Sequence, residues 1–140
     1  VNISIQALIE AVPPYIDGTL TPQTQNDSQA TECGQLSRED GRIDWKRSAQ
    51  DIFNQYRGMT PWPGIWTEFE GKRVKLLSIE LLDSDLKLEP GEIAAQHNVI
   101  VGTGNGNILV QKIQLEGKKK MYSENFLTGY KKQFDKKFFA

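Results

Sequence analysis

Three adjacent lysines, Lys118 to Lys120, form a dense run of positive charge within the stretch GKKKM. Neighbouring side chains splay in several directions, so the three ammonium groups make a broad positive patch and not a single pocket. Such a patch is typical of contact with nucleic-acid phosphates, which is strongly salt-dependent and almost independent of base sequence. The alternative is a solvated loop that binds nothing.

The distribution of charge along the chain is uneven, and by itself it leaves both interpretations open. The chain has a net charge of −1, but residues 1–111 hold 9 Lys and Arg against 15 Asp and Glu, whereas residues 112–140 hold 8 lysines against 3 acids. This split predicts a basic end that meets a polyanion, although a solvated lysine-rich helix is an alternative explanation. Seven further cations extend the patch if the fold brings them together: Arg42, Lys46, Arg47, Lys72, Arg73, Lys131 and Lys132.

Other patterns that would indicate catalysis or metal binding are weak. The single histidine, His97, lies in a predicted turn, and the single cysteine, Cys33, has no partner for a zinc site or an internal disulfide. The glycines of GTGNGN (102–107) precede a predicted strand, whereas a dinucleotide-binding loop requires a helix there. We therefore expect no catalytic residues, no metal and no cofactor in this chain, and a reducing, cytoplasmic compartment.

The elements that position the basic residues are read from hydrophobic periodicity. A helical period over residues 3–16 predicts an amphipathic helix, and the polar stretch 17–31 predicts a linker. A second helix begins after Ser48 as N-cap and ends near Gly58. No apolar run approaches the roughly 20 residues needed to cross a bilayer, so we expect no membrane partner.

Beyond residue 64 the period changes to that of strands. The first two are joined near residues 70–72, and strict alternation in the second places Val74, Leu76 and Ser78 on one face. Asn105-Gly106 predicts a hairpin with positive φ at both residues. The chain is therefore predicted to be mainly β with flanking α: a small OB-like β-barrel preceded by an α-helix and linker, and followed by a short helix within SENFLTGYKKQF.

The stretch TPWPGIW joins the second helix to the first strand. Its prolines stop the helix, and its position favours a buried corner for both Trp62 and Trp66 over exposed surfaces on which bases stack.

The order of several motifs resembles the C-terminal part of bacterial methionyl-tRNA formyltransferases. The motifs that carry the resemblance are LSREDGRIDW, SAQDI, RGMTPWPGIWTEFEGKRVKL, PGEI, VGTGNG and LEGKKKM. The preceding GTLTPQTQNDSQAT resembles the linker of that family, although Glu32 to Gln35 depart from its usual Tyr-Ala-Pro-Lys and weaken any linker contact with RNA.

The resemblance implies that catalysis and tRNA binding belong to separate domains. In that family a catalytic domain transfers a formyl group from 10-formyltetrahydrofolate to the amino group of methionine on initiator tRNA, and a C-terminal OB-like barrel helps to hold the tRNA. Residues 1–35 would be the last helix of the catalytic domain plus the linker, and residues 36–140 the tRNA-binding domain. The family's catalytic residues belong to the N-terminal domain, so we expect this chain alone to be inactive and its parent to be a monomeric enzyme.

By the same resemblance, Lys118, Lys119 and Lys120 would face the tRNA. The alternative function is a structural C-terminal domain of another formyl-folate-dependent transferase or hydrolase that does not bind tRNA. The run of lysines favours the tRNA enzyme, because a domain that only braces its neighbour has no need of it.

Overall fold

The computed structural model describes residues 2–95, 97–130 and 139, and it divides into two compact units, Val1–Gly34 and Gln35–Ala140. The first unit contains helix α1 (Asn2–Ile16), as the hydrophobic period predicts, and a short 3-10 turn, Asp27–Gln29. No residue of α1 is buried, and its apolar side chains are exposed.

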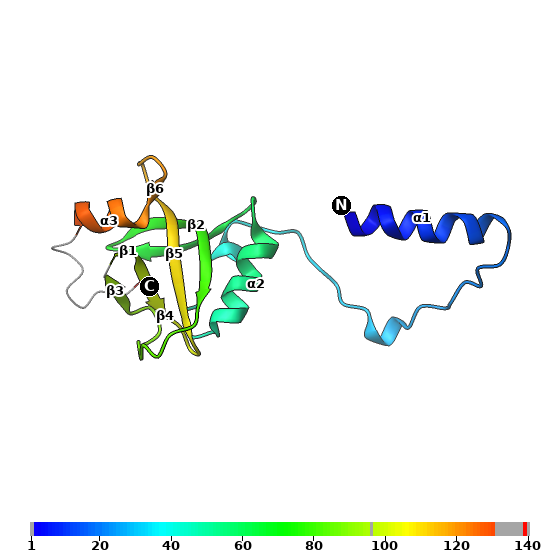
Figure 1. Cartoon of the computed structure of the whole chain (residues 1–140), viewed down its shortest axis with the longest axis horizontal. Helices are drawn as coiled ribbons and strands as arrows, with labels where there is room; N and C mark the ends of the chain where they lie inside the picture. The colour runs from blue at the N-terminus through cyan, green and yellow to red at the C-terminus, as the bar shows by residue number, and fades with distance from the viewer. Residues whose placement is uncertain (1, 96, 131–138, 140) are drawn as a thin grey trace. The chain divides into compact units, whose positions relative to one another are not determined.

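The second unit is built on one antiparallel sheet (Figure 1). The strand order is β1-β2-β5-β4-β3, and β6 pairs with β5. The mainly β fold with flanking helices is therefore confirmed. Within the described residues β1 and β3 do not pair, so closure into a barrel stays a prediction. The strands are β1 (Ile65–Phe69), β2 (Lys72–Leu82), β3 (Ile93–Ala95), β4 (Val99–Gly102), β5 (Asn107–Leu115) and β6 (Met121–Tyr122).

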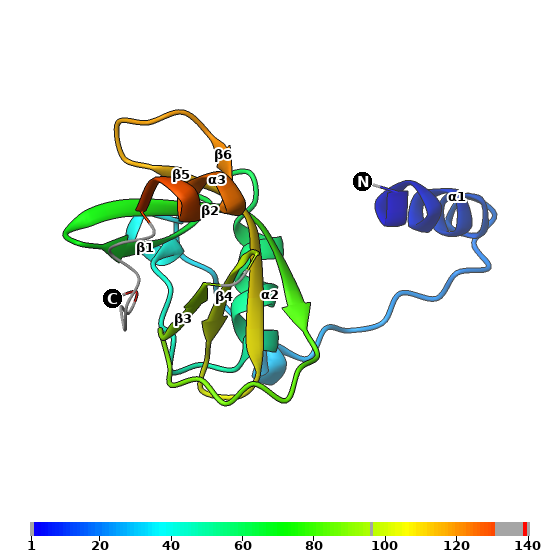
Figure 2. The same ribbon diagram turned by 60° about the vertical axis from the view of Figure 1, so that its left-hand side comes forward.

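Two helices flank this sheet. Helix α2 (Ala49–Met59) packs against β1 and β2, and α3 (Ser123–Tyr130) packs against β4 and β5 (Figure 2). The predicted N-cap is confirmed, because the Ser48 hydroxyl accepts a hydrogen bond of 3.1 Å from the backbone N–H of Asp51. Helix α2 ends at Met59, one residue beyond the predicted stop at Gly58.

Strand β2 does not alternate strictly. Val74 and Leu76 are buried as predicted, but the pairing with β5 shifts register between Leu76 and Ile79. This β-bulge moves the core-facing position to Ile79, which is 3% exposed, so the prediction that Ser78 shares the buried face was wrong. The Ser78 hydroxyl instead donates a 2.8 Å hydrogen bond to the side-chain oxygen of Gln111 on β5.

The β4–β5 turn has four residues, 103–106, and only its last residue has a positive φ (Gly106, 86°). The hairpin at Asn105-Gly106 is confirmed, but the two-residue turn with positive φ at both positions was wrong. Thr103 closes the turn through its backbone N–H and its hydroxyl, which both donate to the carbonyl of Gly106. The backbone N–H of Gly104 donates to the carbonyls of Trp45 and Arg47, both at 2.9 Å, and so holds the loop before α2 against this turn.

The core contains a cluster of aromatic rings. Phe69 contacts Phe126 from α3 and Phe139 edge to face, with centroid separations of 5.7 and 5.8 Å. Phe139 also stacks on Trp45 at 5.8 Å and is 4% exposed. Its backbone N–H donates to the carbonyl of Gly91 at 2.9 Å. A residue near the end of the sequence therefore completes the core.

Candidate nucleic-acid interface

The outward face of β1, β2 and β5 carries two rows of polar and aromatic side chains. Trp66 on β1 lies opposite Lys75 on β2, which lies opposite Gln114 on β5. Residues directly opposite each other in antiparallel strands project from the same face, so these three form one row across the sheet. The next row contains Arg73, with Glu68 opposite it on β1 and Glu116 beside it at the end of β5.

Trp66 lies at the β1 end of the first row and is only 3% exposed. The Arg73 guanidinium lies 4.0 Å from the centroid of its ring, and the Arg42 guanidinium 5.5 Å. The indole N–H donates a 2.8 Å hydrogen bond to the carbonyl of Arg38. The prediction of a buried corner is therefore confirmed for Trp66, whose ring lies beside two guanidinium groups and whose N–H is bonded to the backbone of Arg38.

Two glutamates pair with two of these arginines. Arg73 pairs with Glu39 at 3.4 Å, and Arg42 pairs with Glu68 at 3.8 Å. Both pairs are well exposed to solvent, so they add little to stability. Their carboxylates cancel part of the positive charge beside Trp66.

The segment that supplies Arg38 and Arg42 is fixed by short hydrogen bonds. The backbone N–H and the hydroxyl of Ser37 donate to the Asp40 carboxylate at 2.6 and 2.9 Å. Donation from the backbone N–H, and next from the hydroxyl, holds the pKa of Asp40 below its ordinary value of 3.8. Gln55 of α2 donates to the carbonyls of Asp40 and Arg42, at 2.8 and 3.1 Å, and so attaches this segment to the helix.

Trp62 lies on the surface, with 58% of the residue exposed. The prediction of a buried Trp62 was wrong. Its neighbour Pro63 is the buried anchor of the turn instead, and the backbone N–H of Gly64 donates to the carbonyl of Met59 at 2.9 Å. The turn is thus tied to the end of α2 while the indole of Trp62 projects outward. The Thr60–Pro61 and Trp62–Pro63 peptide bonds are both cis.

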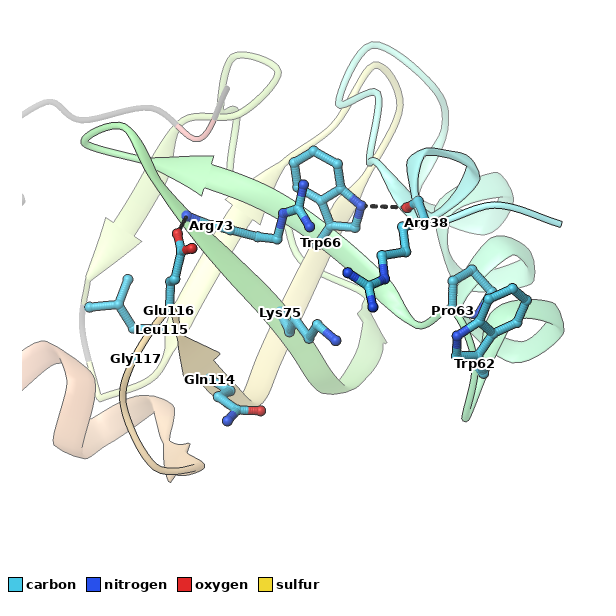
Figure 3. A pocket seen from close by; sticks show the side chains of 10 residues that line it. All are labelled: Arg38, Trp62, Pro63, Trp66, Arg73, Lys75, Gln114, Leu115, Glu116 and Gly117. Carbon is cyan, nitrogen blue, oxygen red and sulfur yellow. Dashed lines mark hydrogen bonds between the residues drawn. The ribbon is translucent and has the colours of Figure 1, made fainter.

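A hollow of about 400 Å³, here called the tryptophan pocket, lies between this turn and the outward rows of the sheet (Figure 3). Figure 3 shows the side chains of Arg38 and Lys75 extending toward the same space between Trp62 and Trp66. The lining residues are Arg38, Trp62, Pro63, Trp66, Arg73, Lys75, Gln114, Leu115, Glu116 and Gly117. Three cations and one carboxylate give the pocket a positive balance.

The predicted lysine run adjoins the tryptophan pocket. Lys118, Lys119 and Lys120 are exposed in the loop between β5 and β6, directly after the lining residues Glu116 and Gly117. The backbone N–H of Lys118 donates to the carbonyl of Leu115, and its carbonyl accepts from the side chain of Gln114. The loop is therefore held at the end of β5 while its three ammonium groups reach solvent.

Only some of the other predicted site residues lie at this end of the sheet. Lys72 begins β2 directly before Arg73, whose carbonyl accepts a hydrogen bond from the backbone N–H of Glu116, so Lys72 lies at this end of the sheet. Lys46 and Arg47 instead lie against the β4–β5 turn, at the opposite end of β5. Nine residues of β5 separate the two groups by about 25 Å. Lys131 and Lys132 lie outside the described residues.

We call the cationic residues that do gather here the basic end of the sheet. They are Arg38, Arg42, Lys72, Arg73, Lys75, Lys118, Lys119 and Lys120. Three pocket residues were not among those predicted from the sequence, namely Arg38, Lys75 and Gln114. Lys75 could have been predicted, because it lies two residues after Arg73 in a strand and their side chains therefore share one face.

Side chains that ligate metals do not cluster in the described part of the chain. It holds no group of three or more His, Cys, Asp or Glu side chains arranged to bind a metal ion. His97 is exposed where the chain turns between β3 and β4. No helix in the described ranges has the length and apolar character needed to cross a membrane.

The chain is similar in sequence to methionyl-tRNA formyltransferases of several organisms. The chain is 40% identical over 124 residues to a methionyl-tRNA formyltransferase of Acidobacterium capsulatum, covering 87% of this chain and 40% of that protein. The corresponding enzyme of Streptococcus mutans is also 40% identical over 124 residues, with 87% and 39% covered. That of Geobacter metallireducens is 41% identical over 114 residues, with 80% and 36% covered. The chain thus spans about 40% of the length of these relatives.

Solved structures share the fold. A variant of HypX from Aquifex aeolicus matches 96% of this chain and 24% of its own with a TM-score of 0.63 at 22% identity. The structure of HypX in complex with tetrahydrofolic acid matches 98% of this chain and 26% of its own, with a TM-score of 0.62 at 20% identity. Residues 35–131, more than half of the chain, match the family model described as formyl transferase, C-terminal domain. The chain therefore belongs to the family of formyl transferase C-terminal domains.

Proposed function

We propose that this chain is the non-catalytic tRNA-binding C-terminal module of a methionyl-tRNA formyltransferase. The whole enzyme transfers a formyl group from 10-formyltetrahydrofolate to the amino group of methionine on initiator tRNA, in the cytoplasm. The catalytic groups belong to an N-terminal domain that is the module's other partner. The relatives named above support this proposal by their names and by their identity over most of the chain.

The observation that carries tRNA binding is the basic end of the sheet. Its eight cations come from three separate segments, namely the stretch before α2, strand β2 and the β5–β6 loop. Such convergence from distant parts of the sequence suits a phosphate backbone, which presents repeated negative charges over a broad surface. Glu39, Glu68 and Glu116 lie among these cations, so we expect moderate affinity and weak preference among tRNAs.

The test compares two double variants that remove the same charge. Lys118/Lys119→Ala acts at the basic end, and Lys46/Arg47→Ala acts about 25 Å away at the other end of β5. Binding of labelled tRNA is measured over a salt series for both variants and the unchanged chain. Each lost phosphate contact lowers the slope of log affinity against log salt by about 1.

We expect the first variant to lose about 2 from this slope and the second to keep the slope of the unchanged chain. Equal losses in the two variants would mean that net charge, and not this surface, governs binding. A chain that binds no tRNA at low salt would contradict the proposal.

The second candidate is a structural C-terminal domain of another formyl-folate-dependent enzyme. The likeness to HypX over nearly all of the chain favours this alternative, because that protein has the same fold within a much longer chain. If the chain binds no tRNA in the salt series above, the structural role is favoured over the tRNA-binding role.

A further inference from the structure

The tryptophan pocket combines a flat apolar surface with two cations that form no ion pair within the described residues. Trp62 offers an indole face that is largely exposed, beside the buried ring of Pro63. Arg42 and Arg73 are engaged by Glu68 and Glu39, but within the described residues Arg38 and Lys75 form no ion pair. Exposed cations beside an exposed indole are free to bind a ligand that is both planar and anionic.

A nucleotide meets this description. Every nucleobase has a π face that stacks on an aromatic side chain, and each such stack is sequence-tolerant. The phosphate attached to that base would lie within the positive balance that Arg38, Lys75 and Arg73 give the pocket, with Glu116 as the opposing charge. A volume of about 400 Å³ falls within the range of small-ligand sites.

The nucleotide must be unpaired. In a duplex both faces of a base are covered by its neighbours, so stacking on Trp62 requires a base from a loop, a bulge or an end. The lysines of the β5–β6 loop adjoin the pocket and would hold the flanking phosphates.

We propose that the tryptophan pocket binds one unpaired RNA nucleotide, with its base stacked on Trp62 and its phosphate held by Arg38 and Lys75. This inference rests on the proposed function and deepens it, because it adds a stacked base to a surface otherwise assigned to phosphates alone.

Trp62 supplies its own spectroscopic signal. The other tryptophans, Trp45 and Trp66, are 5% and 3% exposed, so a base that stacks from solution quenches the fluorescence of Trp62. The 140-residue chain is titrated at low salt with a single-stranded hexauridylate, with a fully paired RNA duplex of six base pairs, and with uridine monophosphate. Trp62→Phe identifies which signal belongs to position 62.

Affinity is measured independently by the anisotropy of the labelled RNAs. We expect Trp62→Ala to weaken binding of the single strand by about 5- to 150-fold, the range for one lost stack, and to leave duplex binding unchanged. Trp62→Phe should retain most of the affinity. Lys75→Ala should weaken single-strand binding, whereas Lys87→Ala, a charge-matched change between β2 and β3, should not.

The outcomes separate this inference from the proposed function. A chain that binds tRNA with a steep salt slope but shows no quenching by the single strand would overturn the nucleotide pocket and leave the tRNA module intact. Quenching without any effect of Lys118/Lys119→Ala on tRNA affinity would keep the pocket and count against the proposed surface. Equal losses for strand and duplex in Trp62→Ala would also overturn the inference, whereas quenching of Trp62 by uridine monophosphate would support a site for a single nucleotide.

Discussion

Replacing Gly104 by alanine should separate the β4–β5 turn from the loop that precedes α2. A Cβ atom at position 104 would overlap the carbonyl oxygen of Lys46 and would lie 2.7 Å from its carbonyl carbon. These are backbone atoms, so no side-chain rotation relieves the overlap. The two segments must move apart, and the two 2.9 Å hydrogen bonds from the Gly104 N–H to the carbonyls of Trp45 and Arg47 lengthen or break.

The expected loss in the free energy of unfolding follows from these two hydrogen bonds. Two backbone hydrogen bonds at about 0.5–1.5 kcal/mol each, together with disturbed packing next to the buried Trp45, give a loss of about 2–4 kcal/mol in the free energy of unfolding. In urea, with an m-value of about 2 kcal/mol/M, the midpoint should fall by about 1–2 M while the slope stays constant.

Gly58 provides a control with the same chemical change and the opposite sign. It lies in α2 with a negative φ, and no atom lies within 4 Å of an added Cβ. Gly58→Ala should therefore stabilise the protein, by up to about 1 kcal/mol, through helix propensity alone. If Gly104→Ala unfolded at the same urea concentration as the unchanged chain, the packing of this turn against the loop would be refuted.

Three further changes test other contacts. Phe126→Ala removes a ring that is 0% exposed and should cost about 3–5 kcal/mol in thermal unfolding, whereas a loss below about 1 kcal/mol would contradict its place in the core. Thr67→Val removes the hydroxyl that accepts the 3.0 Å hydrogen bond from the buried Trp45 indole and should cost about 1–3 kcal/mol in urea, whereas an unchanged urea midpoint would contradict this bond. Asp40→Asn should destabilise the protein at neutral pH. Hydrogen bonds from Ser37 lower the folded pKa of Asp40, so its charged form stabilises the protein above pH 3.8. The difference in stability between the unchanged chain and Asp40→Asn should therefore decrease as the pH falls through the folded pKa, which acid titrations of stability would show.

The elements that the sequence predicts well are those set by nearby residues. The Ser48 cap depends only on Asp51 three positions later, and the turn after β1 depends on Glu70 and Gly71, which both have positive φ (50° and 72°). The formyltransferase motifs are likewise continuous in the sequence. These features were predictable because the residues that determine them are within a few positions of each other.

The candidate site depends instead on long-range register. The row of Trp66, Lys75 and Gln114 forms only because β2 pairs with β5, across 39 positions of sequence, and the bulge in β2 is equally a property of that pairing. Periodicity places Trp62 at a corner but does not say toward which side the corner turns. Charge counts likewise did not separate Lys46 from Lys118, because both are exposed lysines whose positions are fixed by opposite ends of one strand.

The stacking of Phe139 on Trp45 has a consequence for the order in which the protein folds. The two rings are 94 positions apart in the sequence, whereas the β4–β5 hairpin closes across a turn of four residues. Contacts that close long loops carry a large entropic cost before they gain any energy, so the hairpin should form early and the ring should dock late. Phe139→Ala is then expected to accelerate unfolding and to leave the folding rate nearly unchanged, which stopped-flow chevrons would show as a φ-value near zero. The contact between Phe139 and Trp45 thus lowers the unfolding rate of the native state and has little effect on the folding rate.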